Sequence, residues 1–142
     1  MNKLKLISLG GLLIANAALA AAQAQAQELP PMQSAGPVSY TSGGIGSDEA
    51  KAFQQAAPRY PLEMEFVVHA QPRDVYTSDV QVQIADAKGN TILDTVSEGP
   101  FMLAQLPGGR YVISVTDKGK TVVRDVDITP GQHRRVVFAW SA

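Results

Sequence analysis

Apolar side chains alternate with polar ones in several short segments, and this period of two constrains the fold more than any other feature. Between Leu62 and Val68 every second residue is apolar, with Glu63 and Glu65 among the intervening positions. The same alternation returns between Val80 and Ile84. Successive side chains of a strand point to opposite faces of a sheet, so the pattern predicts half-buried strands.

Turn-forming residues separate these segments, as in Lys88-Gly89-Asn90 and Pro107-Gly108-Gly109. We predict strands at 62–68, 79–84, 91–96, 101–106, 110–116, 121–128 and 134–140. Strands at such short intervals favour an all-β, seven-stranded antiparallel β-sandwich over a fold with crossover helices. The predicted core comprises Leu62, Met64, Phe66, Val68, Val80, Val82, Ile84, Leu103, Leu106, Tyr111, Ile113, Val115, Val126, Ile128, Val136, Phe138 and Trp140.

The first 24 residues have the pattern of a secretory signal peptide. Lys3 and Lys5 precede an apolar run that ends near Ala22, and small residues then recur at the spacing of a cleavage site. The run is shorter than the roughly 20 apolar residues that a transmembrane helix needs. We therefore expect export to the periplasm and no transmembrane anchor after cleavage.

Residues 25–41 are rich in Ala, Gln, Pro and Ser, which predicts a disordered tether. Residues 42–61 contain a glycine-rich segment and then a short helix, which we expect to begin with Ser47 as its N-cap and to stop at Pro58. The β-sandwich domain is expected to occupy residues 62–142. Whether the segment before it packs on the sandwich is left open by the sequence.

Charge and cysteine content narrow the classes of function. Removal of the signal peptide takes away Lys3 and Lys5, which leaves 10 basic against 13 acidic residues and a formal net charge of −3. A mildly acidic chain is a poor binder of nucleic acid, so we expect no nucleic-acid partner. The absence of cysteine excludes disulfides, thiolate nucleophiles and thiolate metal sites.

The segment from Gly99 to Val115, with Leu106, the Pro107-Gly108-Gly109 turn and Tyr111, resembles the carboxypeptidase regulatory-like, transthyretin-like (prealbumin-like) sandwich. A wider resemblance, to small periplasmic proteobacterial proteins of this type, rests on the segments 42–46, 60–62, 75–76 and 138–140. The resemblance implies the sandwich fold and periplasmic location. It implies no particular activity, because the name refers to an accessory domain and not to a peptidase.

No catalytic residues, metal site or cofactor are predicted. His69 and His133 are the two histidines, and their spacing carries no zinc signature. Transthyretin-like hydrolases of 5-hydroxyisourate end in a Tyr-Arg-Gly-Ser tail, whereas this chain ends Phe138-Ala139-Trp140-Ser141-Ala142. We therefore expect a non-enzyme, a binding or accessory module for an unidentified protein or envelope component.

The candidate contact residues are Gly43, Gly44, Gly46, Asp48, Glu49 and Tyr76. For the glycines the alternative is a plain turn before a capped helix, and phosphate binding is disfavoured because Asp48 and Glu49 already place negative charge there. Another class stays open, an envelope enzyme or carbohydrate-binding protein with a site built from loops. A weak homodimer by edge-strand pairing of the last strand is a third alternative.

Overall fold

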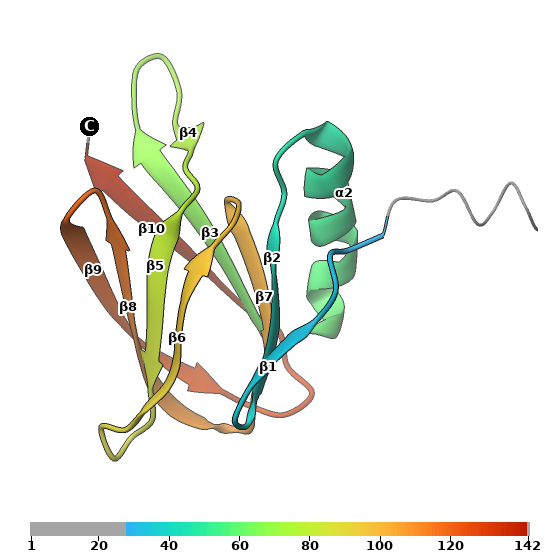
Figure 1. Ribbon diagram of the computed structural model, residues 1–142, viewed down its shortest axis with the longest axis vertical. Helices are drawn as coiled ribbons and strands as arrows, with labels where there is room; N and C mark the ends of the chain where they lie inside the picture. The colour runs from blue at the N-terminus through green and yellow to red at the C-terminus, as the bar shows by residue number, and fades with distance from the viewer. Residues whose placement is uncertain (1–27, 142) are drawn as a thin grey trace, which may run out of the picture.

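The computed structural model describes residues 28–141, which form two β-sheets and one ten-residue α-helix (Figure 1). The predicted signal peptide lies outside the described residues. The elements are β1 (Gln33–Ala35), β2 (Val38–Gly43), α2 (Ser47–Ala56), the 3-10 helix η1 (Ala57–Arg59), β3 (Leu62–His69), β4 (Val75–Tyr76), β5 (Val80–Ala85), β6 (Thr91–Ser97), β7 (Phe101–Gln105), β8 (Gly109–Asp117), β9 (Lys120–Ile128) and β10 (Arg134–Ser141). The all-β prediction is confirmed.

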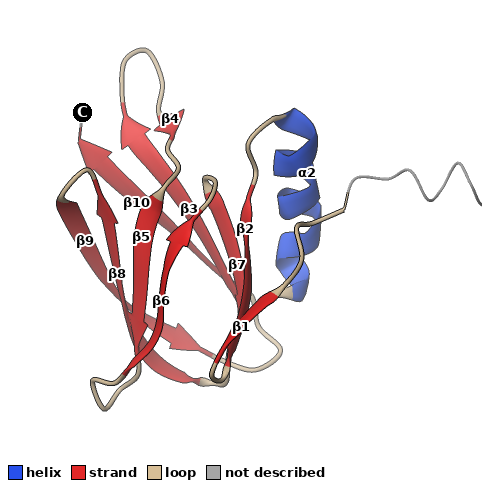
Figure 2. Ribbon diagram, viewed as in Figure 1, coloured by secondary structure: helices blue, strands red, loops and turns tan. Residues whose placement is uncertain are grey.

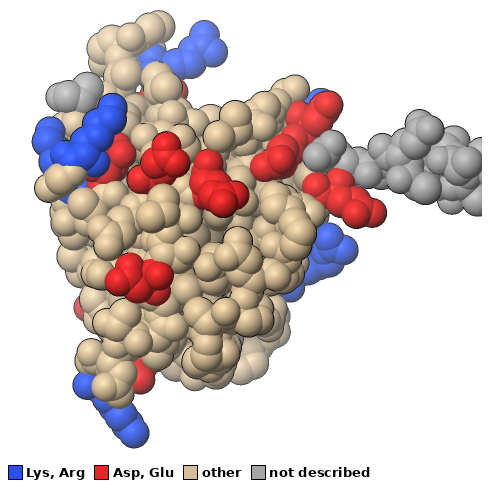
Figure 3. All heavy atoms as spheres, viewed as in Figure 1, with Lys and Arg blue, Asp and Glu red and all other residues tan. Residues whose placement is uncertain are grey.

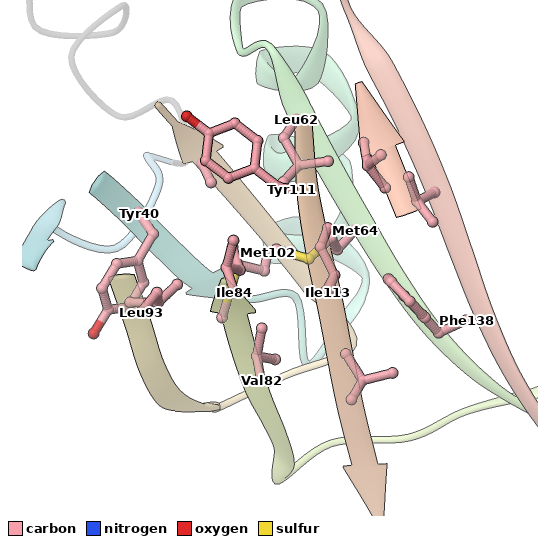
Figure 4. Close-up of a cluster of buried hydrophobic side chains, with 14 of the residues drawn as sticks. Tyr40, Leu62, Met64, Val82, Ile84, Leu93, Met102, Tyr111, Ile113 and Phe138 are labelled. Carbon is pink, nitrogen blue, oxygen red and sulfur yellow. The ribbon is translucent and has the colours of Figure 1, made fainter. Parts of the chain in front are cut away.

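The first sheet has the strand order β1-β2-β7-β3-β10, with β4 also paired to β3, and the second has the order β6-β5-β8-β9. Side chains from both sheets form one buried cluster between them, to which Met64 and Met102 contribute from the first sheet and Ile84 and Ile113 from the second (Figure 4). Of the predicted core, Val68 is half-buried. Leu103 lies in a separate cluster between the first sheet and helix α2.

Each of the seven predicted segments is a strand, but the count of seven is too low, because β1, β2 and β4 are added. The prediction of purely antiparallel pairing is also wrong at one place. β10 runs parallel to β3 along its whole length, from Arg134 opposite Leu62 to Ser141 opposite His69. The reason is that the chain crosses from the second sheet to the first after β9, and such a crossover does not impose the antiparallel pairing that a hairpin does.

The prediction of a disordered tether is wrong from Gln33 onward. β1 and β2 form a hairpin, and β2 pairs with β7 through five residues, from Ser39 opposite Gln105 to Gly43 opposite Phe101. Val38 and Tyr40 are buried in the core between the sheets. The polar composition concealed this strand, because only its inward positions need apolar side chains.

Helix α2 covers the outer face of the first sheet, the face turned away from the second sheet (Figure 2). Its apolar side, with Phe53 and Ala56, packs on Phe101 and Leu103 of β7. The Phe53 and Phe101 rings are stacked with centroids 6.0 Å apart. The segment between residues 42 and 61 therefore packs on the sheet, which answers the question left open by the sequence.

Strands β7 and β4 both pair with β3, and the change from one partner to the other occurs at Pro100. Phe66 N–H donates to the Pro100 carbonyl (2.9 Å), but Pro100 has no N–H to return. The Phe66 carbonyl instead accepts from Thr77 N–H (3.1 Å). Strand β4 thus continues along β3 where β7 ends, with Tyr76 opposite Val67.

Candidate functional site

Two segments that are far apart in the sequence meet at one end of the first sheet. Gly44, Ile45 and Gly46 follow β2. Tyr76 ends β4, and Thr77 and Ser78 come directly after it. With Pro100 between them they line an open hollow of about 310 Å³. Three of the predicted contact residues, Gly44, Gly46 and Tyr76, therefore belong to one surface feature.

Two exposed apolar side chains line this hollow, Ile45 (67% exposed) and Tyr76 (50% exposed). Val75 is also 55% exposed, but it lies opposite Val68 in the strand pair, so its side chain points to the other face of the sheet. The other large apolar side chains that are exposed in the described part of the chain are Met32 in the segment before β1, Val96 in β6 and Val123 in β9. We call Ile45 and Tyr76 the apolar rim. Isolated exposed apolar residues are ordinary, whereas a group beside a hollow is typical of a contact surface.

Contacts with Phe101 of β7 and Glu65 of β3 hold Tyr76 in place. Its ring lies 5.2 Å from the Phe101 ring, centroid to centroid, and its hydroxyl interacts with the Glu65 carboxylate. Burial raises the pKa of the Tyr76 hydroxyl, and the negative charge of Glu65 and the hydrogen bond with it raise it further, against a smaller opposing effect of Arg135. One face of the tyrosine is thus fixed while the other is open to solvent.

Buried charges lie next to Tyr76 on the same outer face. The Glu63 and Glu65 side chains are 8% and 9% exposed, although the alternation places them on the polar side of their strand. Arg135 donates to Glu65, and the His133 Nε2 lies 2.9 Å from Glu63 Oε1. The other ring nitrogen of His133 faces the Tyr60 carbonyl oxygen at 2.9 Å. These pairs compensate the buried carboxylates and attach β10 and the turn before it to β3.

The glycines shape the loop beside the hollow. Gly44 has φ +97°, and a Cβ added there would lie 2.3 Å from the Phe101 ring. Gly46 has φ +90°, with open space around it. The Gly44 N–H donates to Glu49 Oε1 at 2.8 Å, so Glu49 braces the loop from the first turn of the helix.

Of the other predicted contact residues, Gly43 is buried beside Glu49, and Asp48 is exposed on the helix. Gly43 and Glu49 therefore support the loop and do not line the hollow. The expected Ser47 cap is wrong, because the cap position is Gly46 and no side chain caps the helix. Sequence reasoning missed Ile45, whose signal was an apolar residue inside a glycine-rich segment.

The histidines lie at opposite ends of one strand pair. His69 is opposite Ser141, whereas His133 immediately precedes Arg134, which is opposite Leu62. The eight residue steps from His133 to Ser141 separate the two histidines by roughly 26 Å along the strand. His69 contacts Asp74 (Nδ1 to Oδ1, 3.0 Å). Within residues 28–141, no group of three or more metal-binding side chains comes together.

A second hollow, of about 460 Å³, lies at the other end of β3, where Tyr60, Pro107 and Pro130 meet. Its lining is mostly proline, glycine and main chain, with Arg59 as the charged residue. It brings no set of acid, base and nucleophile together.

The face drawn in Figure 3 shows acidic side chains spread over the second sheet, with basic ones toward its margins. That face offers no continuous basic track for a nucleic-acid backbone. In the described part of the chain, no helix has the length and apolar character required to cross a membrane.

Comparison with known proteins adds no assignment to this geometry. Neither a protein-family model nor a curated protein matches the sequence.

Proposed function

We propose that the protein is a non-catalytic binding module, exported to the periplasm, that contacts a protein of the cell envelope through the apolar rim. One observation carries this proposal. Residues 44–46 and 76–78, 30 positions apart in sequence, meet at a hollow where Ile45 and Tyr76 are each at least half exposed.

The chemistry of the hollow supports binding over catalysis. Its lining offers glycine backbone, three hydroxyl side chains and apolar surface, without a carboxylate or imidazole in the described residues. Tyr76, the one lining residue with an acidic proton, directs its hydroxyl to the buried Glu65. An active site brings titratable groups together on a substrate, whereas a contact surface needs a rigid apolar anchor.

The family is part of the same proposal. The Leu106, Pro107-Gly108-Gly109 and Tyr111 pattern that resembles the transthyretin-like, carboxypeptidase regulatory-like sandwich occupies the end of β7, the turn and β8. Tyr111 donates its hydroxyl to the Pro107 carbonyl at 2.7 Å, a contact that fixes the turn at the rim of the core. Membership of that family would give a scaffold commonly used for accessory roles, in keeping with a binding module.

Photo-crosslinking in the producing cell tests the proposal. A photoreactive amino acid is placed at Ile45 or Tyr76, and, as controls, at Val96 or Val123, which are 51% and 54% exposed on the second sheet. We expect one specific protein adduct from the first pair and none from the second. Adding Tyr76→Ser to the Ile45 probe, which removes the ring without placing a second carboxylate beside Glu65, should abolish the adduct.

Two results would contradict this function: no adduct from Ile45 or Tyr76, or the same adducts from all four positions. N-terminal sequencing of the purified protein tests the export part separately. A chain that starts between residues 21 and 27 is expected, and a chain that retains residues 1–20 would overturn it.

A further inference from the structure

Carboxylates from three separate segments border the hollow between residues 44–46 and 76–78. Asp48, Asp79 and Glu98 are exposed, and each stands one or two positions along the chain from a residue that lines the hollow. Two steps of chain span at most about 7 Å, so all three residues lie close to it. In Figure 3 acidic side chains are visible at this end of the molecule, where helix α2 begins. We call Asp48, Asp79 and Glu98 the acidic border.

Neighbouring cations do not neutralise the acidic border. The ion pairs within residues 28–141 join His69 to Asp74, Arg110 to Asp127, His133 to Glu63 and Arg135 to Glu65. None of them involves a residue of the acidic border, and the lining of the hollow, as described, has no basic side chain. Lys51 and Arg73, the nearest basic residues along the chain, stand five and three positions from the lining. The border therefore has an excess of negative charge.

Tyr76 presents an aromatic face inside this border. Contacts with Phe101 and Glu65 hold one side of the ring, and the residue is 50% exposed. The face of an aromatic ring is negative and attracts cations within about 6 Å of its centre, arginine more often than lysine. A guanidinium can stack its plane on the ring while its N–H groups reach nearby carboxylates. The ring and the acidic border therefore favour the same group of a ligand.

We propose that the partner presents an arginine beside an apolar residue, and that the arginine stacks on Tyr76 while the apolar residue contacts Ile45. This inference rests on the proposed function and adds to it the chemistry of the partner's contact segment. The Debye length at physiological ionic strength is about 8 Å, so carboxylates this near the hollow act on a ligand bound there and weaken as salt is added. The same charges repel an acidic peptide or a phosphate group.

An NMR titration of the purified protein with two synthetic tripeptides tests the proposal. The first is acetyl-Leu-Arg-Leu-amide, and the second has citrulline, a neutral analogue of nearly the same shape, in place of arginine. We expect the arginine peptide to shift the amide signals of Ile45 and Tyr76, with a dissociation constant at least about tenfold lower than that of the citrulline peptide. Added salt should reduce this difference.

A variant with a neutral border identifies the charges that are responsible. Asp48→Asn, Asp79→Asn and Glu98→Gln together remove three negative charges and keep the shapes of the side chains. Asparagine also suits the positive φ of Asp79 (+59°), so we expect the variant to fold. It should bind the two peptides equally.

The matched control removes three negative charges from the outer face of the second sheet, by Asp94→Asn, Asp125→Asn and Asp127→Asn. These residues are exposed on β6 and β9. The control should keep the full preference for the arginine peptide.

Equal affinity of the wild type for the two peptides, no binding of either, signal shifts centred on the second sheet, or the same preference in both triple variants would overturn the proposal. Failure of the proposed function gives a different result. An Ile45 photo-adduct that is undiminished in the variant with the neutral border would leave the binding function intact and overturn the arginine contact alone. No photo-adduct in the cell, together with selective binding of the arginine peptide, would uphold the chemistry of the hollow and overturn the envelope partner.

Discussion

Gly44 and Gly46 stand two positions apart in one loop, yet they should respond differently to the same substitution. Both have positive φ, but only at Gly44 would a Cβ meet a neighbour, the Phe101 ring at 2.3 Å. Gly46→Ala should destabilise the protein by about 1–3 kcal/mol through backbone strain alone. Gly44→Ala should lower the free energy of unfolding by roughly 1–3 kcal/mol more than Gly46→Ala does, because its Cβ would also overpack against the Phe101 ring.

Urea unfolding of the two variants measures the difference. Phe101 is held between Phe53 and Tyr76, which limits how far its ring can move. Equal destabilisation by the two alanines would show that Phe101 does not lie against the loop.

The Tyr76 hydroxyl makes a pH-dependent contribution that a single variant can isolate. Burial and Glu65 raise its pKa in the folded protein above the ordinary tyrosine value of about 10. A group with a raised folded pKa stabilises the protein below its unfolded pKa and loses that contribution as the pH rises. The wild type should therefore lose more stability than Tyr76→Phe above about pH 10.

Urea titrations at pH 8 and above pH 10 check this, with the remaining tyrosines common to both proteins. The effect should be small, because half of the Tyr76 side chain faces water. Parallel loss of stability in the two proteins would contradict the contact with Glu65.

Residue patterns predicted which positions face the core better than they predicted the outer face. The alternation in β3 correctly placed Leu62, Met64 and Phe66 between the sheets. It placed Glu63 and Glu65 in solvent, and they are buried. Periodicity reports which side chains share a face, but it cannot report that distant residues such as Arg135 and His133 will cover that face.

At the scale of elements, helix α2 should contribute to stability as part of the fold. Phe53 is 1% exposed and packs on Phe101 and Leu103. Phe53→Ala should lower the free energy of unfolding by about 3–5 kcal/mol, as deletion of a buried aromatic ring does elsewhere. Gln54→Ala, at an exposed position of the same helix, should change it by less than about 0.5 kcal/mol.

Thermal unfolding of the two variants provides the measurement. A small effect of Phe53→Ala would mean that the helix is loosely attached and that the loop before it is not rigidly positioned.

Elements with strong local patterns were predictable, and elements defined by distant partners were not. The hairpin of β5 and β6 was indicated by its turn, where the Asp86 carboxylate accepts from the N–H groups of Lys88 and Asn90. β2 has few apolar residues, and its partner β7 lies about 60 positions later in the chain. The parallel pairing of β10 with β3 likewise has no local signal, because it depends on how the chain crosses between the sheets.

At the scale of the whole molecule, residues 33–61 and the later strands share one structure. β2 extends the first sheet, Val38 and Tyr40 enter the core, and α2 closes the outer face. This arrangement brings Ile45 beside Tyr76. The candidate site could therefore be predicted only as two separate groups of residues, at the glycine-rich segment and at Tyr76, and the fold supplied their proximity.

The central claim is that the protein binds a partner through the apolar rim. The most direct test is an NMR titration of the isotope-labelled protein with a cell-envelope extract of the organism that produces it. We predict that the amide signals of Ile45 and Tyr76 lose intensity first, while those of Val96 and Val123 persist. Uniform loss across the molecule, or loss centred on the second sheet, would contradict the claim.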